Sequence, residues 1–510
     1  MKTYCFTTLL FLVSCFNLSA QVKFQKTYGG VGFDFGTNCK ITPDGGAIVT
    51  GGMGTPASSR PVMFLMRLDM NGDTLWMKTY DDSDDSGGRS VDQTSDGGFV
   101  VTGFSNYSNT IIVWKTNSTG DLLWTKGYYY GFSSEGESIM ETSDHGFLVC
   151  GYGGNAINLV KTNDVGDTLW TRIISPNAPC RPYTLCETTS GKYAVAGYTS
   201  TSANGTDFFL LTLDASGTPL SFSTYGGTGD EQCFSLIETL DHGFMLAGRT
   251  VFNLGNPYDD ALLIKTNASG AVEWASIYGD AIDEYAYDVK QVSDSGFIVT
   301  GQKLNIPDNS PDAYLFRINS SGNVMWSKTY GGHGNDQAAN VQILSDGGFL
   351  LTGTTMDISV GSTDVYLIKT DSLGNSGCLE NVVFTNRDTI TLYTDHPIYS
   401  FTSGMNETTP SFFVSASYAV NTICTTIGID ENNLQNELLI YPNPSSGEFI
   451  VRSKNTISSI EIYDQPGQNI YSRKLNSAES TIDLTHFAAG VYFVICHMSD
   501  MTIYKKLILN

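Results

Sequence analysis

Short runs of alternating apolar and polar residues recur along most of the chain and predict β-strands. One unit opens with the tight turn Asp96-Gly97-Gly98 and continues into an apolar run over residues 99–103 that ends in glycine. A second run ends in a basic residue and threonine, and a glycine turn then leads into a strand that carries tryptophan. Alternation with a period of two residues is typical of half-buried strands, whereas helical repeats show a period of about 3.6 residues. Each unit therefore holds about four strands.

The turn that opens the unit occurs seven times, at intervals of about 50 residues. Its copies begin at Asp44, Asp96, Asp144, Ser190, Asp241, Asp294 and Asp346. A single four-stranded unit cannot cover both of its faces, so neighbouring units must pack on one another. Four strands at this period are typical of a β-propeller blade, whereas a β-helix has a shorter period.

The two ends of the repeat region predict that the ring of units closes. The seventh unit stops at residues 370–374 and lacks its tryptophan strand, whereas residues 22–28 repeat the pattern of that strand with Phe24 in the tryptophan position. Pairing of this first strand with the last unit removes an open sheet edge. The sequence therefore predicts an all-β chain whose residues 21–375 form a seven-bladed β-propeller closed by the N-terminal strand.

The repeat resembles the seven-bladed β-propeller repeat of many bacterial exported proteins. The resemblance is carried by residues 225–231, 241–248 and 260–270, and it covers roughly residues 22–375. It departs at residues 179–182, where two prolines replace the Tyr-Gly-Gly stretch, so we expect the fourth blade to be irregular. The resemblance implies the fold and an extracellular setting, and it implies no single activity.

From residue 438 onward the pattern changes to about seven short alternating strands, which predict a small antiparallel Ig-like β-sandwich over residues 437–510. This stretch closely resembles the type A C-terminal sorting domain of type IX secretion substrates. The matching residues are Tyr441, Pro442, Asn443, Pro444, Gly447, Gly467, Gly490, Tyr492, Lys506 and Leu507. The resemblance implies that the type IX translocon is a partner, and that the domain is usually cleaved and the cargo often attached to lipopolysaccharide. An ordinary Ig-like module is the alternative.

Residues 376–436 break the repeat and are rich in Asn and Thr. We interpret them as a connecting region, packed on the propeller edge, whose last part is a linker. The N-terminus combines Lys2, an apolar run over residues 6–16 and Ser19-Ala20-Gln21, which predicts a secretory signal peptide over residues 1–20 that is cleaved after Ala20. In the alternative interpretation, residues 12–15 are a lipobox and Cys15 carries a lipid.

The predicted location is the outer cell surface or the extracellular space, reached through the periplasm. No later stretch is long and apolar enough for a transmembrane helix. The chain has 28 Lys and Arg against 52 Asp and Glu, a net charge of −24, and this acidity excludes nucleic acid as a partner. After the signal peptide, Cys180 with Cys186 and Cys378 with Cys424 are the candidate disulfide pairs.

A carboxylate follows most copies of the Tyr-Gly-Gly stretch and is predicted to lie on one rim of the propeller. These residues are Asp34, Asp84, Asp85, Glu135, Asp230, Glu231, Asp283, Glu284 and Asp336. We favour the interpretation that each caps its own turn or solvates the rim. The alternative is a ring that binds Ca²⁺ or basic ligands, with Asp34, Asp230, Glu231, Asp283, Glu284 and Asp336 as the candidates.

A second repeated acid precedes the strand that ends in a basic residue. Its copies are Asp207, Asp260, Asp312 and Asp364, and the basic residue lies five positions further on, at Lys265, Arg317 and Lys369. We expect these two groups to form structural ion pairs.

The chain shows none of the usual catalytic motifs: it has no nucleophile elbow, no HExxH and no Walker loop. His145 and His242 occupy the position that glycine takes in other copies of the turn. No cofactor is expected, and the predicted function is that of a non-catalytic binding or scaffold protein for a carbohydrate or a surface protein. The alternative is an exported propeller enzyme acting on polysaccharide or peptide, for which the irregular stretch at residues 174–181 is the candidate site.

Overall fold

The computed structural model describes residues 21–510 apart from 56–57, 84, 106–109, 131–133, 202–204, 228, 252–257, 281, 307, 360–361, 416–418, 429–437, 443–444, 464–468, 489, 499–501 and 510. The predicted signal peptide and Asp84 lie outside the described residues. The chain divides into two compact units, Val22–Thr426 and a second unit that contains Ile427–Asn510. Each is described by itself.

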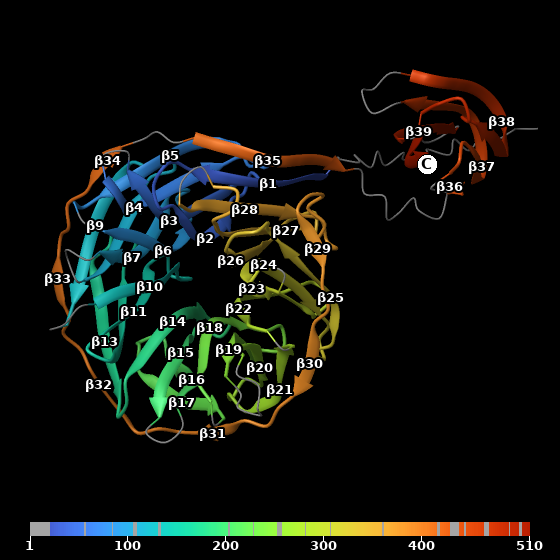
Figure 1. Cartoon of the computed structure of the whole chain (residues 1–510). Coiled ribbons are helices and arrows are strands. Elements are labelled where there is room, and N and C mark those ends of the chain that lie inside the picture. The colour runs from blue at the N-terminus through green and yellow to red at the C-terminus, as the bar shows by residue number, and fades with distance from the viewer. Residues whose placement is uncertain are drawn as a thin grey trace, which may run out of the picture. The chain divides into compact units, whose positions relative to one another are not determined.

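The first unit consists of seven antiparallel five-stranded sheets arranged around a circle, a β-propeller-like architecture (Figure 1). We number these sheets as blades 1 to 7. The innermost strands are, in blade order, β2 (Phe35–Ile41), β6 (Ser86–Gln93), β10 (Ser134–Glu141), β14 (Cys180–Glu187), β18 (Glu231–Glu238), β22 (Glu284–Gln291) and β26 (Asp336–Ile343). The second strands are β3 (Ala47–Thr55), β7 (Phe99–Ser105), β11 (Phe147–Gly153), β15 (Tyr193–Thr201), β19 (Phe244–Thr250), β23 (Phe297–Asn305) and β27 (Phe349–Thr355).

The third strands are β4 (Ser58–Leu68), β8 (Ile111–Thr116), β12 (Ala156–Thr162), β16 (Gly205–Leu213), β20 (Asp260–Thr266), β24 (Ser310–Ile318) and β28 (Asp364–Thr370). The fourth strands are β5 (Thr74–Asp81), β9 (Leu122–Tyr129), β13 (Thr168–Pro176), β17 (Pro219–Gly226), β21 (Val272–Gly279), β25 (Val324–Tyr330) and, in blade 7, β1 (Gln21–Gly29). Because β1 pairs with β28, with Phe24 opposite Lys369, the start of the described chain completes the last blade. Blade 4 has the same strand order as the others, because its Pro182 lies on the innermost strand, where a missing N–H breaks few ladder bonds.

The outermost strand of every blade comes from residues that follow the repeats. These strands are β34 (Phe413–Ser415), β33 (Asn406–Thr408), β32 (Tyr399–Thr402), β31 (Tyr393–Asp395), β30 (Asn386–Thr389), β29 (Glu380–Val382) and β35 (Ala419–Gly428), in blades 1 to 7. The chain visits blade 6 first, runs backwards to blade 1 and ends on β1 in blade 7, so it encircles the first unit (Figure 1). We call residues 380–428 the belt. The sequence assigned them to a connecting region and gave no partner for each strand.

The apolar face of each blade packs on its neighbour, as the two-residue alternation requires. Val113 of blade 2 and Phe147 of blade 3, for example, share one buried cluster. Fully burying side chains of this size stabilises a fold by about 1.5–3 kcal/mol each. The tyrosine that ends the fourth strand adds a polar link to the next blade, because Tyr80 donates its hydroxyl to the Gly120 carbonyl at 2.7 Å and Tyr278 donates to Gly322 at 2.8 Å.

The turn between the first and second strands of each blade requires a left-handed residue. Gly97 has a φ of 83°, and His145 has a φ of 65° at the equivalent position. His242 also has a positive φ, of 64°, so both histidines take the place of glycine in this turn, as the sequence indicates.

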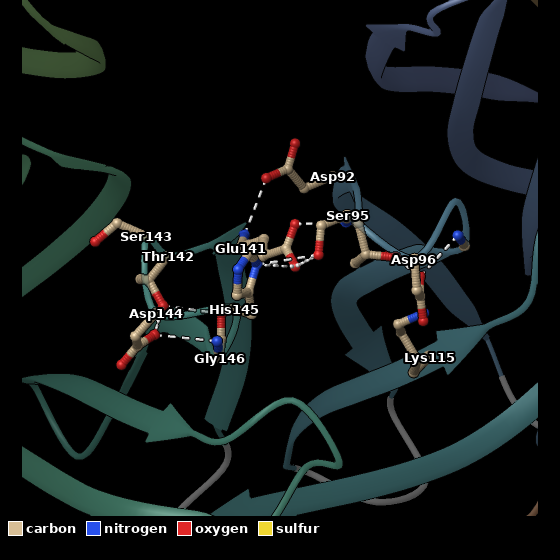
Figure 2. A network of polar contacts seen from close by, with 12 residues as sticks. Asp92, Ser95, Asp96, Lys115, Glu141, Thr142, Ser143, Asp144, His145 and Gly146 are labelled. Carbon is tan, nitrogen blue, oxygen red and sulfur yellow. Dashed lines mark hydrogen bonds and ion pairs between the residues drawn. The ribbon is translucent and has the colours of Figure 1, made fainter.

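The predicted pairing of Asp260 with Lys265 and of Asp312 with Arg317 is wrong. Lys265 pairs with Asp241 at 2.9 Å, and Arg317 pairs with Asp294 at 2.6 Å, while Lys369 donates to the Met70 carbonyl at 2.7 Å. Five residues along a strand span about 17 Å, which places the acid and the base at opposite ends of the strand. The aspartate that opens the Asp-Gly-Gly turn lies instead beside the basic residue near the end of the third strand. Figure 2 shows this for Asp96 and Lys115.

The prediction that Cys180 pairs with Cys186 is also wrong, because both thiols are free. Both residues lie on β14, where six positions span about 20 Å, and a disulfide needs Cα atoms within about 7 Å. Cys378 is disulfide-bonded. Its pairing with Cys424 stays a prediction, since that side chain is outside the described residues.

The second unit contains β36 (Leu438–Tyr441), β37 (Glu448–Tyr463), β38 (Asn469–Asp483), β39 (Gly490–Met498) and β40 (Thr502–Leu509). The predicted Ig-like sandwich of two sheets is not confirmed, because these five strands belong to one hydrogen-bonded sheet. The long strand β37 shifts register between Arg452 and Ile457; it pairs with β36 before this shift and with β39 after it. One core cluster, which includes Phe449, Ile460 and Leu507, collects side chains from both halves of the sheet.

Replacing His145 by Val is expected to lower the free energy of unfolding by about 1–2 kcal/mol, because a β-branched residue is strained at positive φ. Replacement by Gly should change it by less than about 0.5 kcal/mol, because glycine adopts this φ freely. Denaturant unfolding of the two variants tests this. Equal stabilities for the Val and Gly variants would contradict the role assigned to this position.

Candidate functional site

A β-bulge occurs at the same position in all seven innermost strands. One residue of each strand is skipped in the pairing with the second strand. The skipped residues are Thr37, Arg89, Glu137, Tyr183, Phe234, Tyr287 and Ala339, and all seven line a cavity of about 730 Å³ at the centre of the ring. Because a bulge frees a side chain from the regular alternation, this position can present different chemistry in each blade without disturbing the ladder.

Three consecutive blades place aromatic rings at this position. The rings of Tyr183 and Phe234 meet edge to face with centroids 5.4 Å apart, and Phe234 meets Tyr287 in the same way at 5.5 Å. All three side chains are half-buried, so each keeps part of its ring open to the cavity. We call these residues the aromatic arc. At the same position, Ala339 of blade 7 and Thr37 of blade 1 are small, so the lining of the channel is asymmetric.

A charged cluster borders the aromatic arc at blades 3 and 4. Arg181 Nε donates to Glu137 Oε1 at 3.0 Å, and the Arg181 guanidinium lies 4.1 Å from the ring centre of Tyr152. Glu137 is buried, and this burial raises the pKa of its carboxyl despite the neighbouring guanidinium groups. Burial also raises the pKa of Tyr183 to about 12, so its hydroxyl stays protonated and can donate a hydrogen bond. The cluster therefore offers fixed donors and acceptors beside an apolar surface.

Asp288, which follows Tyr287 of the aromatic arc, anchors a polar network in blades 5 to 7. Its carboxylate accepts hydrogen bonds from Ser235 Oγ at 2.7 Å, from Lys290 Nζ at 2.6 Å and from Asn340 Nδ2 at 2.7 Å. These residues belong to three consecutive inner strands. The network therefore ties blades 5, 6 and 7 together and fixes the wall of the channel.

A serine, a histidine and a glutamate meet between blades 2 and 3 (Figure 2). Ser95 Oγ donates to Glu141 Oε1 at 2.7 Å and lies 3.1 Å from His145 Nδ1. A serine nucleophile must pass its proton to the histidine, whereas here the hydroxyl bonds the carboxylate directly. Ser143 Oγ donates to Glu187 between blades 3 and 4 in the same way, so this contact links neighbouring blades.

The carboxylates predicted from the sequence lie at the start of the inner strands. Asp34, Glu231, Glu284 and Asp336 are buried, Asp283 is half-buried and Asp230 is exposed. The N–H groups of Gly30, Gly227 and Gly332 donate to Asp34, Glu231 and Asp336 at 2.7, 3.0 and 3.1 Å. These bonds agree with turn capping. No group of three or more His, Cys, Asp or Glu in the described part of the chain could hold a metal ion.

Sequence reasoning missed the aromatic arc and the charged cluster. A signal was present: the bulge position changes from Thr to Arg, Glu, Tyr and Phe among repeats whose neighbouring positions stay similar. Recognising it requires knowing that this position leaves the alternation, which depends on the pairing register.

The residues that resemble a sorting motif are placed in different parts of the second unit. Tyr441 ends β36, Gly490 begins β39, and Lys506 and Leu507 belong to β40, where Leu507 is fully buried. Gly447 has a φ of 119°, and a Cβ there would lie 2.7 Å from the Thr485 Cα. Tyr492 donates its hydroxyl to the Ala488 carbonyl at 2.7 Å. Pro442 follows β36, whereas Asn443, Pro444 and Gly467 lie outside the described residues.

A family model described as the secretion system C-terminal sorting domain matches residues 439–510. The chain therefore ends in a type IX sorting domain. A chain with this sorting domain is exported to the cell surface or the extracellular space. Within the described residues, the structure contains no helix that is long and apolar enough to cross a membrane. No curated protein matches the chain.

Among solved structures, PorZ of Porphyromonas gingivalis is 10% identical and is described as an essential bacterial surface component of the type IX secretion system. The match covers 95% of this chain and 75% of PorZ, with a TM-score of 0.31. A proposed gluconolactonase is also 10% identical, over 57% of this chain and 90% of its own, with a TM-score of 0.33. Both TM-scores lie below 0.5, so neither likeness carries an argument about this protein.

Proposed function

We propose that this protein is an exported, non-catalytic carbohydrate-binding protein. Its seven-bladed β-propeller binds the ligand at the central channel. The sorting domain engages the type IX translocon, and residues 1–20 are a signal peptide that is removed after Ala20. The observation that carries the proposal is the aromatic arc of Tyr183, Phe234 and Tyr287 beside the Arg181–Glu137 pair.

The chemistry of this wall suits a sugar. The C–H face of a pyranose ring can pack on an aromatic ring, while its hydroxyls bond carboxylate and guanidinium groups. A binding site of this kind combines apolar and aromatic walls with a few fixed polar groups, and the cavity of about 730 Å³ has a volume typical of such sites. The acidic chain as a whole, with a net charge of −24, favours neutral over strongly anionic ligands.

The alternative function is an exported enzyme acting on polysaccharide or peptide. Candidate groups for its chemistry are Glu137, Arg181 and Tyr183, together with Asp288 at the wall of the channel. Glu137 Oε1 accepts the hydrogen bond from Arg181 Nε, which favours the charged carboxylate, whereas burial raises the pKa of this carboxyl. The activity screen on Glu137→Gln below therefore separates the two functions.

Replacing Tyr183 or Phe234 by Ala is expected to raise the Kd for the bound glycan roughly tenfold, because central aromatic side chains contribute the most to binding. A glycan array with the purified protein identifies the ligand, and calorimetry measures the change. Tyr393→Ala is the matched control, because this aromatic ring is 74% exposed on the belt.

Two outcomes would contradict the proposal. One is unchanged affinity in both channel variants, and the other is turnover of a polysaccharide or peptide that is lost in Glu137→Gln.

A further inference from the structure

Two buried carboxylates face each other at the junction between blades 6 and 7. Asp312 in β24 is 2% exposed, and Asp336 at the start of β26 is fully buried. Gly331 lies between them: a Cβ there would sit 2.9 Å from Asp312 Oδ1 and closer still to Asp336 Oδ2. The glycine therefore leaves room for the two carboxylates to approach each other.

Several oxygens at this junction are buried and make no hydrogen bond of normal geometry. They are Asp312 Oδ1, Asp336 Oδ1 and the hydroxyl of Thr355, which lies directly opposite Asp336 on β27 and is fully buried. The second oxygens are satisfied, because Asn305 Nδ2 donates to Asp312 Oδ2 at 3.2 Å and the Gly332 N–H donates to Asp336 Oδ2. A buried charge without compensation costs several kcal/mol, so this site needs either a cation or a proton.

The equivalent junction one blade earlier holds a cation beside its acids. There Asp260 and Glu284 flank Gly279 just as Asp312 and Asp336 flank Gly331. Lys303 lies opposite Glu284 in the same register that places Thr355 opposite Asp336, and its ammonium group forms an ion pair with Glu284. Blades 5 and 6 therefore carry their own cation. Blades 6 and 7 have carboxylates at the corresponding positions, with the Thr355 hydroxyl in place of that cation.

We propose that Asp312, Asp336 and Thr355 bind a Ca²⁺ ion between blades 6 and 7. All three residues offer oxygen, the ligand atom that Ca²⁺ prefers, and two carboxylates match its charge of +2. Ca²⁺ takes about six to eight oxygens in irregular geometry, so backbone carbonyls or waters would complete its shell, whereas Mg²⁺ demands a near-octahedral shell.

Burial, followed by the neighbouring Asp336, raises the pKa of Asp312 to about 7, and burial raises the pKa of Asp336 to about 6. Without a metal ion, the pair would hold a proton near neutral pH, because two close carboxylates do not both ionise readily. Ca²⁺ would displace that proton and link the third strand of blade 6 to the first strand of blade 7.

Thermal melting of the purified protein at neutral pH, in saturating CaCl₂ and in EDTA, tests this proposal. We expect CaCl₂ to raise the Tm by about 4 °C relative to EDTA, because an ion that binds only the folded state stabilises it. Asp312→Asn should lose this response, and equilibrium dialysis should show one bound Ca²⁺ fewer than in the unmodified protein.

The neighbouring junction supplies two matched variants. Thr355→Lys should bring the Tm in EDTA up to the value in CaCl₂ and remove the response, because it copies Lys303. Lys303→Thr should add a second Ca²⁺ to the protein. The proposal is overturned if CaCl₂ leaves the Tm and the bound Ca²⁺ unchanged, or if the response survives in both Asp312→Asn and Thr355→Lys. A Tm that depends on pH between about 5 and 8 but not on Ca²⁺ would assign a shared proton to this pair instead.

Discussion

Excision of the belt, residues 380–428, is expected to abolish the cooperative unfolding of the first unit. Each belt strand pairs with the outer strand of one blade, as Tyr393–Asp395 does with residues 224–226. Without the belt, the fourth strand of every blade becomes an exposed edge, which favours pairing with other chains and aggregation.

Belt side chains also complete the apolar clusters between blades. The half-buried residues Val383, Ile390, Leu392, Tyr399, Met405 and Phe412 pack on five of these clusters. Phe412 lies 5.9 Å from the ring of Trp114, and Tyr399 lies 5.7 Å from the ring of Phe222. At about 1–2 kcal/mol each, their sum is on the order of 10 kcal/mol, which is comparable with the whole free energy of unfolding of a typical protein.

Calorimetry on the excised protein measures this effect. The matched control is truncation after Gly428, which keeps the belt and removes the sorting domain. Because the two units are separately compact, this truncation should leave the Tm of the first unit within about 2 °C. An excised protein that melts cooperatively at the same temperature as the truncated one would show that the belt does not stabilise the blades.

Deletion of residues 438–510 is expected to stop export, so that the protein remains inside the outer membrane. The sorting domain is matched over residues 439–510 and forms its own core around Ile460, Val494 and Leu507. Since the first unit does not share this core, it should stay folded while the export signal is absent. Immunoblots of medium, surface and periplasmic fractions measure the redistribution, which should exceed about tenfold.

A point variant tests whether export requires the folded sorting domain rather than only the presence of residues 438–510. Leu507→Arg places a charge in the core of the sorting domain, where burial of an unpaired charge is strongly destabilising. It should block export as the deletion does, whereas the exposed substitution Leu439→Arg, at a residue 51% exposed, should leave export nearly unchanged. Export of the deletion variant at the normal level would refute the assignment of the signal to this domain.

Local sequence carries the repeating part of the fold. Two-residue alternation and a recurrent Asp-Gly-Gly turn depend only on neighbours within one hairpin. The strands and turns can therefore be predicted from short stretches of sequence. His145 and His242 have a positive φ because the turn itself requires it, so the sequence of the turn was sufficient to predict their conformation. The displaced strand that begins with Val22 was visible because it repeats a pattern found in every other unit.

The sequence by itself thus determined the strands, the turns, the number of repeats and the presence of the sorting domain. Only the tertiary structure decided that residues 380–428 visit the blades in reverse order, because six of the seven belt strands have only three or four residues and leave no periodic signal. It also decided that the bulges turn Tyr183, Phe234 and Tyr287 into one wall, and that Lys265 reaches Asp241 rather than Asp260. These arrangements depend on the register between strands and on contacts between blades, and a one-residue change in register would move every side chain involved.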